Sequence, residues 1–128
     1  MTGHIPSHIK LRKRTQILEL QFADKTFDLP AEFLRVHSPS AEVRGHGEEQ
    51  AVLQYGKRNV SIIDIDQQGH YAIRLVFDDG HDSGIYTWDY LYELGTHQEA
   101  LWHTYLKKLA SESKAREAGV SGIKIIDP

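Results

Sequence analysis

The sequence predicts an α+β fold in which a small antiparallel β-sheet of about five strands is packed by a short helix and a C-terminal helix. Three observations predict this class. Residues 60–88 contain three strand-like segments separated by short turns, residues 16–29 have the pattern of a hairpin, and residues 97–111 have the apolar spacing of an amphipathic helix. A length of 128 residues suits one domain with its own core.

The first elements expected are a hairpin and a short helix. In QILELQF, residues 16–22, Leu18, Leu20 and Phe22 alternate with polar residues, as in a half-buried strand. A short turn leads to TFDL, which alternates again. Pro30 suits the first position of a helix and AEFLRV follows with helical apolar spacing, so a short helix is expected at about 30–37.

A long loop and a three-strand meander are expected next. Residues 37–56 are rich in Ser, Pro and Gly, which predicts a loop with at most one further turn or short strand. The segments NVSIIDID and HYAIRLVFDD then read as strands, and DGHDS leads to a third, GIYTW. Together they predict an antiparallel meander over residues 60–88.

Two helical segments follow the meander. Asp89 is expected to cap a short turn, YLYEL, that Gly95 ends. Thr96 and Glu99 have the spacing of a capping box for the helix HQEALWHTYLKKLAS. This helix is expected to pack on the sheet through Leu101, Trp102, Tyr105 and Leu109.

We expect one domain over residues 15–110, with a basic flexible arm at 1–14 and a flexible tail at 111–128. The arm contains four of the fifteen basic residues and no acidic residue, so eleven basic residues face eighteen acidic ones in the rest of the chain. An acidic body without a basic stripe would repel phosphate. Nucleic acid is therefore not expected as a partner.

Composition excludes several kinds of site. The chain has no cysteine, which excludes disulfides, thiolate metal sites and cysteine nucleophiles. No apolar run is long enough to span a membrane, and the first residues lack the apolar core of a secretory signal. We therefore expect a cytoplasmic protein with no membrane partner.

The segment FDDGHDSG, residues 77–84, places a histidine among aspartates at a predicted turn. From the residues alone, His81 could hold a metal, move a proton or serve only the turn. Nucleophilic catalysis is not indicated, because Ser38, Ser40 and Ser83 have no adjacent base in the sequence and no G-x-S-x-G motif occurs.

Three segments, LPAEFLRVHSPSAEV, GKRNVSI and VFDDGHDSGIYTWDYLYELG, together resemble the gamma-butyrobetaine hydroxylase-like N-terminal domain family over about residues 16–106. In dioxygenases of that family this domain precedes a separate catalytic barrel. It also occurs alone or fused to P-loop ATPases of iron–sulfur assembly. The resemblance implies an accessory module without catalytic residues of its own.

The resemblance also bears on metal binding. Metal-bearing members of the family hold a structural zinc through Cys-x-Cys-x-x-Cys and a distant histidine on a D-G-H turn. The resemblance places Ser38, Ser40 and Val43 at the cysteine positions and His81 at the histidine. Neutral serine is a poor zinc ligand and valine is none, so no tetrahedral zinc site is expected. We expect His81 to tie the hairpin tip to the 37–47 loop by hydrogen bonds instead.

Two functions remain open. The first is a non-enzymatic interaction module without a cofactor, serving iron–sulfur or other cofactor pathways through an unidentified protein partner. The candidate contact residues are exposed aromatics: Tyr86, Trp88, Tyr90 and Tyr92.

The second function is the binding of iron or another divalent metal. Histidines flank the vacated cysteine positions, and imidazole with carboxylate suits such ions. The candidate ligands are His37, His46, His81 and Asp82. The sequence leaves the oligomeric state open.

Overall fold

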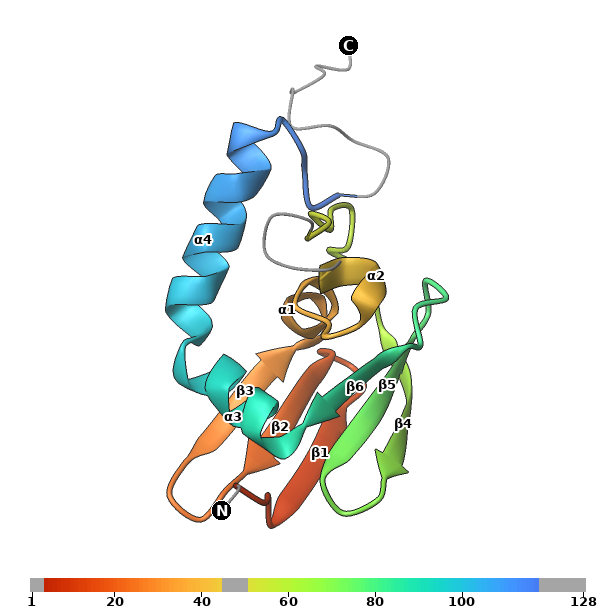
Figure 1. The fold of residues 1–128 in the computed structure, drawn as a ribbon, viewed down its shortest axis with the longest axis vertical. Helices are drawn as coiled ribbons and strands as arrows, with labels where there is room; N and C mark the ends of the chain where they lie inside the picture. The colour runs from red at the N-terminus through yellow and green to blue at the C-terminus, as the bar shows by residue number, and fades with distance from the viewer. Residues whose placement is uncertain (1–3, 45–50, 118–128) are drawn as a thin grey trace.

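The computed structural model describes residues 4–44 and 51–117, which form an α+β fold of two three-stranded antiparallel sheets and four helices (Figure 1). The first sheet contains β1 (His8–Arg12), β2 (Ile17–Gln21) and β3 (Thr26–Pro30). The second contains β4 (Ile62–Gln68), β5 (Ala72–Phe77) and β6 (Gly84–Thr87). The helices are α1 (Ala31–Val36), α2 (Ala41–Arg44), α3 (Trp88–Thr96) and α4 (Gln98–Ser111). None of these helices is long and apolar enough to cross a membrane.

The first sheet contains the predicted hairpin, β2–β3, together with a strand that the sequence analysis did not predict. β1 pairs antiparallel with β2, from His8 opposite Gln21 to Arg12 opposite Ile17. The prediction of a flexible arm is therefore wrong for β1. Its apolar residues, Ile9 and Leu11, pack against the core, while the residues between them point to solvent. In the sequence this short alternation was overlooked because basic residues lie between and after Ile9 and Leu11.

The second sheet is the predicted meander. β4 and β5 pair from Ile62 opposite Phe77 to Gln68 opposite Ala72, with an irregularity near the start of β4. After β5 the chain turns at Gly80, whose φ of 90° suits a residue without a Cβ. The amide of Phe77 then donates to the carbonyl of His81 at 2.9 Å, which closes the turn.

The core lies between the two sheets and the helices α1 and α3. Its fully buried side chains come from all four of these parts: Leu18, Leu20, Leu29, Phe33, Leu34, Ile73, Leu75, Phe77, Tyr86 and Leu91. The first turns of α4 reach this core through Leu101 and Trp102. Farther along, Tyr105 and Leu109 pack with Val36 of α1 in a second, smaller cluster, so α4 stands beside α1 (Figure 1).

The helix ends differ from the predicted caps. Thr87, rather than Asp89, caps α3, because its hydroxyl accepts from the amide of Tyr90 at 3.1 Å. The predicted capping box before α4 is not formed. Thr96 lies in the last turn of α3 and donates to the carbonyl of Tyr92 at 2.8 Å, so its hydroxyl is not used for α4.

Part of the predicted C-terminal tail is docked. The amide of Gly56 donates to the carbonyl of Ala115 at 2.9 Å. The guanidinium of Arg116 makes two bonds to the Glu32 carboxylate of α1, at 2.7 and 2.9 Å. The prediction of flexibility is therefore wrong for this part, because a bidentate pair with a buried carboxylate holds it. Residues 118–128 lie outside the described residues.

Candidate functional site

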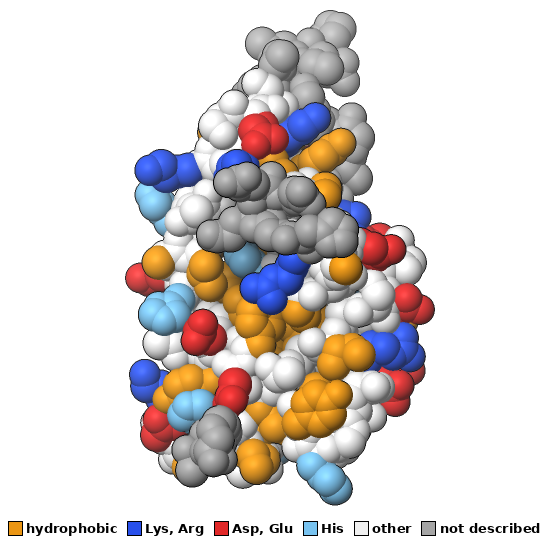
Figure 2. Space-filling view, in the orientation of Figure 1, with side chains coloured by type: hydrophobic (Ala, Val, Ile, Leu, Met, Phe, Trp, Pro, Cys, Tyr) orange, Lys and Arg blue, Asp and Glu red, His pale blue; other side chains and the backbone are white. Residues whose placement is uncertain are grey.

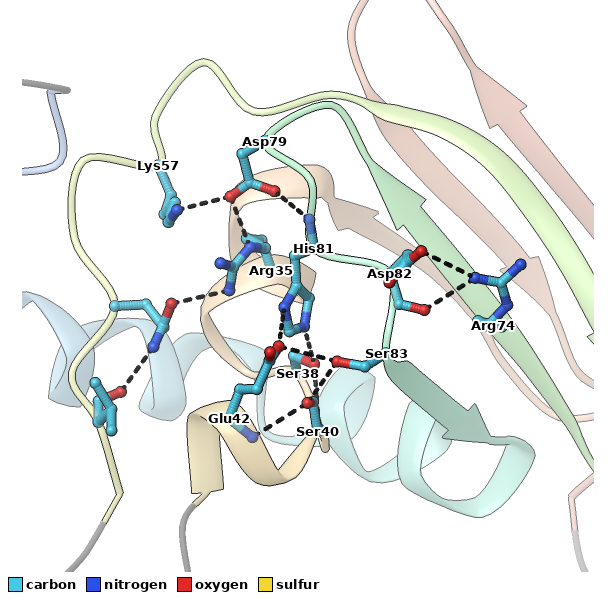
Figure 3. A network of polar contacts seen from close by, with 12 residues as sticks. Arg35, Ser38, Ser40, Glu42, Lys57, Arg74, Asp79, His81, Asp82 and Ser83 are labelled. Carbon is cyan, nitrogen blue, oxygen red and sulfur yellow. Dashed lines mark hydrogen bonds and ion pairs between the residues drawn. The ribbon is translucent and has the colours of Figure 1, made fainter.

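A polar cluster joins the segment after α1 to the turn between β5 and β6 (Figure 3). Ser38 and Ser40 follow α1, Glu42 lies in α2, and His81 and Ser83 lie between the two strands. We call these five residues the His81 cluster. Ser38, Ser40 and His81 are 1 %, 6 % and 7 % exposed, whereas Glu42 and Ser83 are exposed, so the cluster extends from the interior to the surface.

His81 is at the centre of this cluster. Its Nε2 lies 2.8 Å from Ser38 Oγ, and its Nδ1 lies 3.2 Å from Glu42 Oε1. Ser83 Oγ donates to the same carboxylate oxygen at 3.0 Å, and Ser40 Oγ lies 2.7 Å from Ser83 Oγ. The expected tie between the hairpin tip and the 37–47 loop is therefore present.

The direction of each hydrogen bond follows from the carboxylate of Glu42, which can only accept. His81 Nδ1 and the Ser83 hydroxyl both donate to it. With its own hydrogen used in this way, Ser83 accepts from Ser40, and the remaining imidazole nitrogen accepts from the Ser38 hydroxyl. Every hydroxyl hydrogen of the cluster then has an acceptor.

The electrostatic environment favours this neutral imidazole. Burial lowers the pKa of His81, and the charge of Arg35 lowers it further. The nearby carboxylates of Glu42 and Asp79 act in the opposite direction, but the pKa remains below its ordinary value. Neutral His81 can accept from Ser38, whereas a protonated imidazole could not.

An ion network anchors the turn that carries His81. The Asp79 carboxylate accepts from Arg35 Nε at 2.9 Å, from Lys57 Nζ at 2.6 Å and from the His81 amide at 3.1 Å. Burial by itself would raise the pKa of Asp79, but these hydrogen bonds and the Arg35 charge lower it to about 2. Because Arg35 belongs to α1, the network ties the turn to that helix (Figure 3).

Close approach of the two segments requires Gly84, the first residue of β6. A Cβ at this position would lie 2.5 Å from Ser38 Oγ and 3.1 Å from the ring of Tyr86. Sequence reasoning missed Gly84, and it also missed Glu42 and Ser83 as cluster members. Ser83 contacts Glu42 across 41 positions of the chain, so no local spacing could have indicated the pair.

The predicted metal ligands that the structure describes, His37, His81 and Asp82, are not brought together. His37 Nδ1 donates to a carbonyl of its own helix at 2.9 Å, and Asp82 pairs with Arg74 at 3.6 Å, away from His81 (Figure 3). His46 lies outside the described residues. Across residues 4–44 and 51–117, no three His, Cys, Asp or Glu side chains are grouped closely enough to hold a metal ion.

Ser38, His81 and Glu42 have the order of a nucleophile, base and acid in a catalytic triad. Their burial is the reverse of what a triad needs. Ser38 is 1 % exposed, whereas the Glu42 side chain is 73 % exposed. A substrate carbonyl could not reach a hydroxyl buried in this way, so the arrangement supports structure rather than acyl transfer.

The predicted partner-binding aromatics are mostly not exposed. Tyr86 is fully buried and Trp88 is 7 % exposed, so the prediction of exposure is wrong for these two. Alternation along β6 directs Tyr86 into the core and Ile85 outward. The Tyr86 hydroxyl donates to the carbonyl of Leu34.

The other two predicted aromatics, Tyr90 and Tyr92, are half-buried. The Tyr90 hydroxyl donates to the carbonyl of His37, and the Tyr92 hydroxyl donates to Asp24 at 2.6 Å. The Tyr92 ring also stacks on His4, with centroids 3.6 Å apart. The Arg44 guanidinium lies over the Tyr90 ring, so both rings already have contacts within the protein.

Comparison with known proteins places the chain in a family. Residues 9–92 match the family described as gamma-butyrobetaine hydroxylase-like, N-terminal. The chain is similar to a protein solved by NMR in solution, with 54 % identity over 98 % of this chain and 99 % of that one, and a TM-score of 0.84. It is also similar to a second NMR structure, with 41 % identity over 99 % of each chain and a TM-score of 0.76.

A third similar structure is the crystal structure of a protein with unknown function from Acidithiobacillus ferrooxidans ATCC 23270, which belongs to the DUF971 family. It shares 36 % identity over 70 % of this chain and 91 % of that chain, with a TM-score of 0.59. No curated protein matches the chain.

The family match begins in β1 and ends in α3, so it contains both sheets and the whole His81 cluster. The chain has no cysteine, in agreement with the loss of the zinc-binding thiolates. From the match and the fold together we conclude that the chain belongs to the gamma-butyrobetaine hydroxylase-like N-terminal domain family.

Proposed function

We propose that this protein is a non-enzymatic accessory module that acts by binding a protein partner in an iron–sulfur or other cofactor pathway. The observation that carries the proposal is the His81 cluster. Where the family resemblance places a zinc site, buried side chains bond to one another, beginning with Ser38 Oγ and His81 Nε2 at 2.8 Å. The pathway in this proposal rests on the family resemblance.

The chemistry of the cluster supports a structural role. Its hydroxyl and imidazole groups donate to and accept from one another, which satisfies them without a ligand. The cluster holds the segment after α1 in place, and Ser38 and Val43 of that segment also line a surface groove. By holding this segment in place, the His81 cluster also fixes the shape of a surface that is open to a partner protein.

The experiment is affinity capture followed by reconstitution. The full chain, carrying a tag without histidines, captures proteins that are identified by mass spectrometry and then purified. We expect one of them to form a complex of fixed stoichiometry with the purified chain in sedimentation velocity experiments. If none of the purified candidates forms such a complex at concentrations of tens of micromolar, the proposal is wrong.

Metal analysis of the untagged protein decides between this proposal and the metal-binding alternative. We expect no stoichiometric metal, and no rise in melting temperature on addition of iron(II), zinc or manganese. One equivalent of bound metal that is lost in a His81→Ala variant would instead establish a metal-binding protein.

A further inference from the structure

A groove of about 800 Å³ lies between the helices α3 and α4 on one side and the segments around α2 on the other. Figure 2 shows apolar side chains gathered in a hollow on this face, with basic and histidine side chains beside it. The apolar lining consists mainly of Val36, Val43, Leu53, Leu94, Leu101 and Tyr105. A concave apolar surface of this size is typical of a binding site.

The polar groups of the groove floor are already bonded within the protein. The Tyr105 hydroxyl donates to the carbonyl of Gln54 at 2.7 Å, and the Tyr90 hydroxyl donates to the carbonyl of His37. The floor therefore offers ring faces and aliphatic groups, and few free hydrogen-bonding groups. This favours aliphatic or aromatic side chains as ligands over sugars or nucleotides, which need several polar partners.

The charged groups that line the groove are mainly basic. Arg44 and Lys108 approach it from opposite walls, and His37 and His97 also line it. Glu93 is the one carboxylate among the lining residues that the structure describes. Two cationic side chains and one carboxylate therefore line the groove among the described residues, whereas the protein as a whole carries a net charge of −3.

The two cations are placed to receive an anionic group. The Arg44 guanidinium lies 5.3 Å from the centroid of the Tyr90 ring, and the ion pairs among the described residues do not include it. Lys108 contacts Glu112 at 3.4 Å, but both side chains are about half exposed. Such an exposed pair contributes little and can exchange for a ligand carboxylate.

We propose that this groove binds an acidic amphipathic segment of a partner protein. The apolar side chains of the segment lie on the floor of the groove, between the helices α3 and α4 and the segments around α2, and its carboxylates pair with Arg44 and Lys108. This inference rests on the proposed function and names its contact surface. An apolar stripe bound between helices and flanked by matched charges is a common mode of peptide recognition.

The test uses two synthetic 14-residue helical peptides with the same leucine face, one carrying glutamates and the other lysines on the polar face. Each is titrated into the ¹⁵N-labelled full chain and followed by NMR. We expect saturable shifts at the amides of groove residues with the glutamate peptide, and at least tenfold weaker binding of the lysine peptide. Equal affinities, shifts centred elsewhere, or no saturation at 1 mM would overturn the inference.

Charge reversal gives matched variants. We expect Arg44→Glu and Lys108→Glu each to weaken binding of the glutamate peptide at least fivefold. Lys107→Glu changes the same charge on the neighbouring position of α4, which does not line the groove, and should alter the affinity less than twofold. Circular dichroism and thermal unfolding confirm that each variant is folded. Unchanged affinity in the first two variants would contradict the inference.

The captured partner separates the two proposals. If the double variant Arg44→Glu/Lys108→Glu still binds the reconstituted partner with unchanged affinity, the groove assignment is wrong and the proposed function stands. If the unaltered chain forms no complex with any purified candidate, the proposed function itself fails. If the double variant loses the partner and Lys107→Glu retains it, both proposals are supported.

Discussion

His81 holds the turn between β5 and β6 against the segment after α1 with its two ring nitrogens. One nitrogen bonds to Ser38 and the other to Glu42, both more than 38 positions away in the chain. Removal of the ring would leave the Ser38 hydroxyl buried without its acceptor, and a buried unsatisfied group costs more than an average hydrogen bond contributes.

A His81→Ala variant should therefore lower the free energy of unfolding by about 1–3 kcal/mol. Urea denaturation measures the change, and addition of zinc or a chelator should alter neither protein. His103→Ala, at an exposed position of α4, serves as the control and should stay within about 0.5 kcal/mol of the unaltered protein. Equal stability of all three proteins would show that the cluster does not hold the turn.

Gly84 sets how closely the two segments of the cluster approach. Gly84→Ala should lower the free energy of unfolding by about 1–3 kcal/mol, because the new Cβ would overlap Ser38 Oγ. In a Ser38→Ala background the nearest overlapping atom is gone, so the same substitution should cost less. A double-mutant cycle measured by urea denaturation gives this coupling. If the effects of Gly84→Ala and Ser38→Ala on the free energy of unfolding are strictly additive, the strain does not come from contact between the new Cβ and Ser38 Oγ.

β1 is the element whose role differs most from the sequence-based expectation. Its two apolar residues cover the core next to β2, while Arg12 pairs with Glu19 at 2.7 Å on the outer side. Because solvent screens this exposed ion pair, it contributes little to stability. Burial of Ile9 and Leu11 contributes more, so apolar packing is what holds β1 in the sheet.

Leu11→Asp should consequently destabilise the protein by about 2 kcal/mol or more, because it places a carboxylate against the core. Lys10→Asp, at the neighbouring exposed position, should have a much smaller effect. Thermal unfolding gives the stability of each variant, and hydrogen exchange shows whether the amides of β1 lose protection. Equal effects of the two substitutions would mean that β1 is held by charge rather than by packing.

The helices α3 and α4 show the same dominance of tertiary contacts over local signals. Asp89 and Thr96 have suitable cap residue types, yet Thr87 caps α3 and Thr96 bonds within it. The strand β6 fixes where the chain leaves the sheet, and α3 therefore begins at Trp88, whose ring NH donates to the carbonyl of His70 at 2.8 Å. Thr87, the residue before Trp88, then provides the cap, an interaction worth about 1 kcal/mol.

The whole molecule combines a main core, shared by both sheets, with the smaller cluster that attaches α4 to α1. The His81 cluster lies at the edge of the main core, where the resemblance places a metal. Hydrogen bonds and apolar packing therefore act together in this region. Because His37 and His81 titrate differently in the folded and unfolded chains, the stability of the fold should depend on pH.

Stability should rise as the pH increases toward about 6.5, the ordinary pKa of histidine. Burial lowers the pKa of both His37 and His81 in the folded protein, so the unfolded chain binds more protons in this range. Their contribution is complete above about pH 6.5, the ordinary value for histidine, and is lost as the pH falls through the lowered pKa. Urea denaturation across this range measures the slope, which should be smaller in His81→Ala. A slope of opposite sign would contradict the neutral imidazole.

A second loss of stability is expected in acid. The folded-state pKa of Asp79 is about 2, below its model-peptide value of 3.8. Asp79 is an exposed residue, so solvent screening reduces its contribution to about 1 kcal/mol; this is present above about pH 4 and should be lost as the pH falls toward 2. Asp79→Asn should remove this step while leaving the histidine-dependent slope at higher pH. Unfolding curves at pH 2–5 check this directly.

Local patterns predicted much of this protein. The alternation of Leu18, Leu20 and Phe22, the three segments of the meander and the helical spacing after Pro30 each depend on neighbours in the chain, and each element formed as expected. The absence of cysteine excluded a thiolate zinc site in the same way, because ligand chemistry depends on residue type alone.

Only the tertiary structure determined which distant residues meet. Glu42 and Ser83 lie beside His81 only in the folded chain, and Gly84 lies against Ser38 for the same reason. Tyr86 is buried in the core, and β1 pairs with β2 in the first sheet. The tertiary structure also forms the groove between α3, α4 and the segments around α2. Local sequence fixes which face of an element is apolar, but the partner of each face is chosen by packing among segments tens of residues apart.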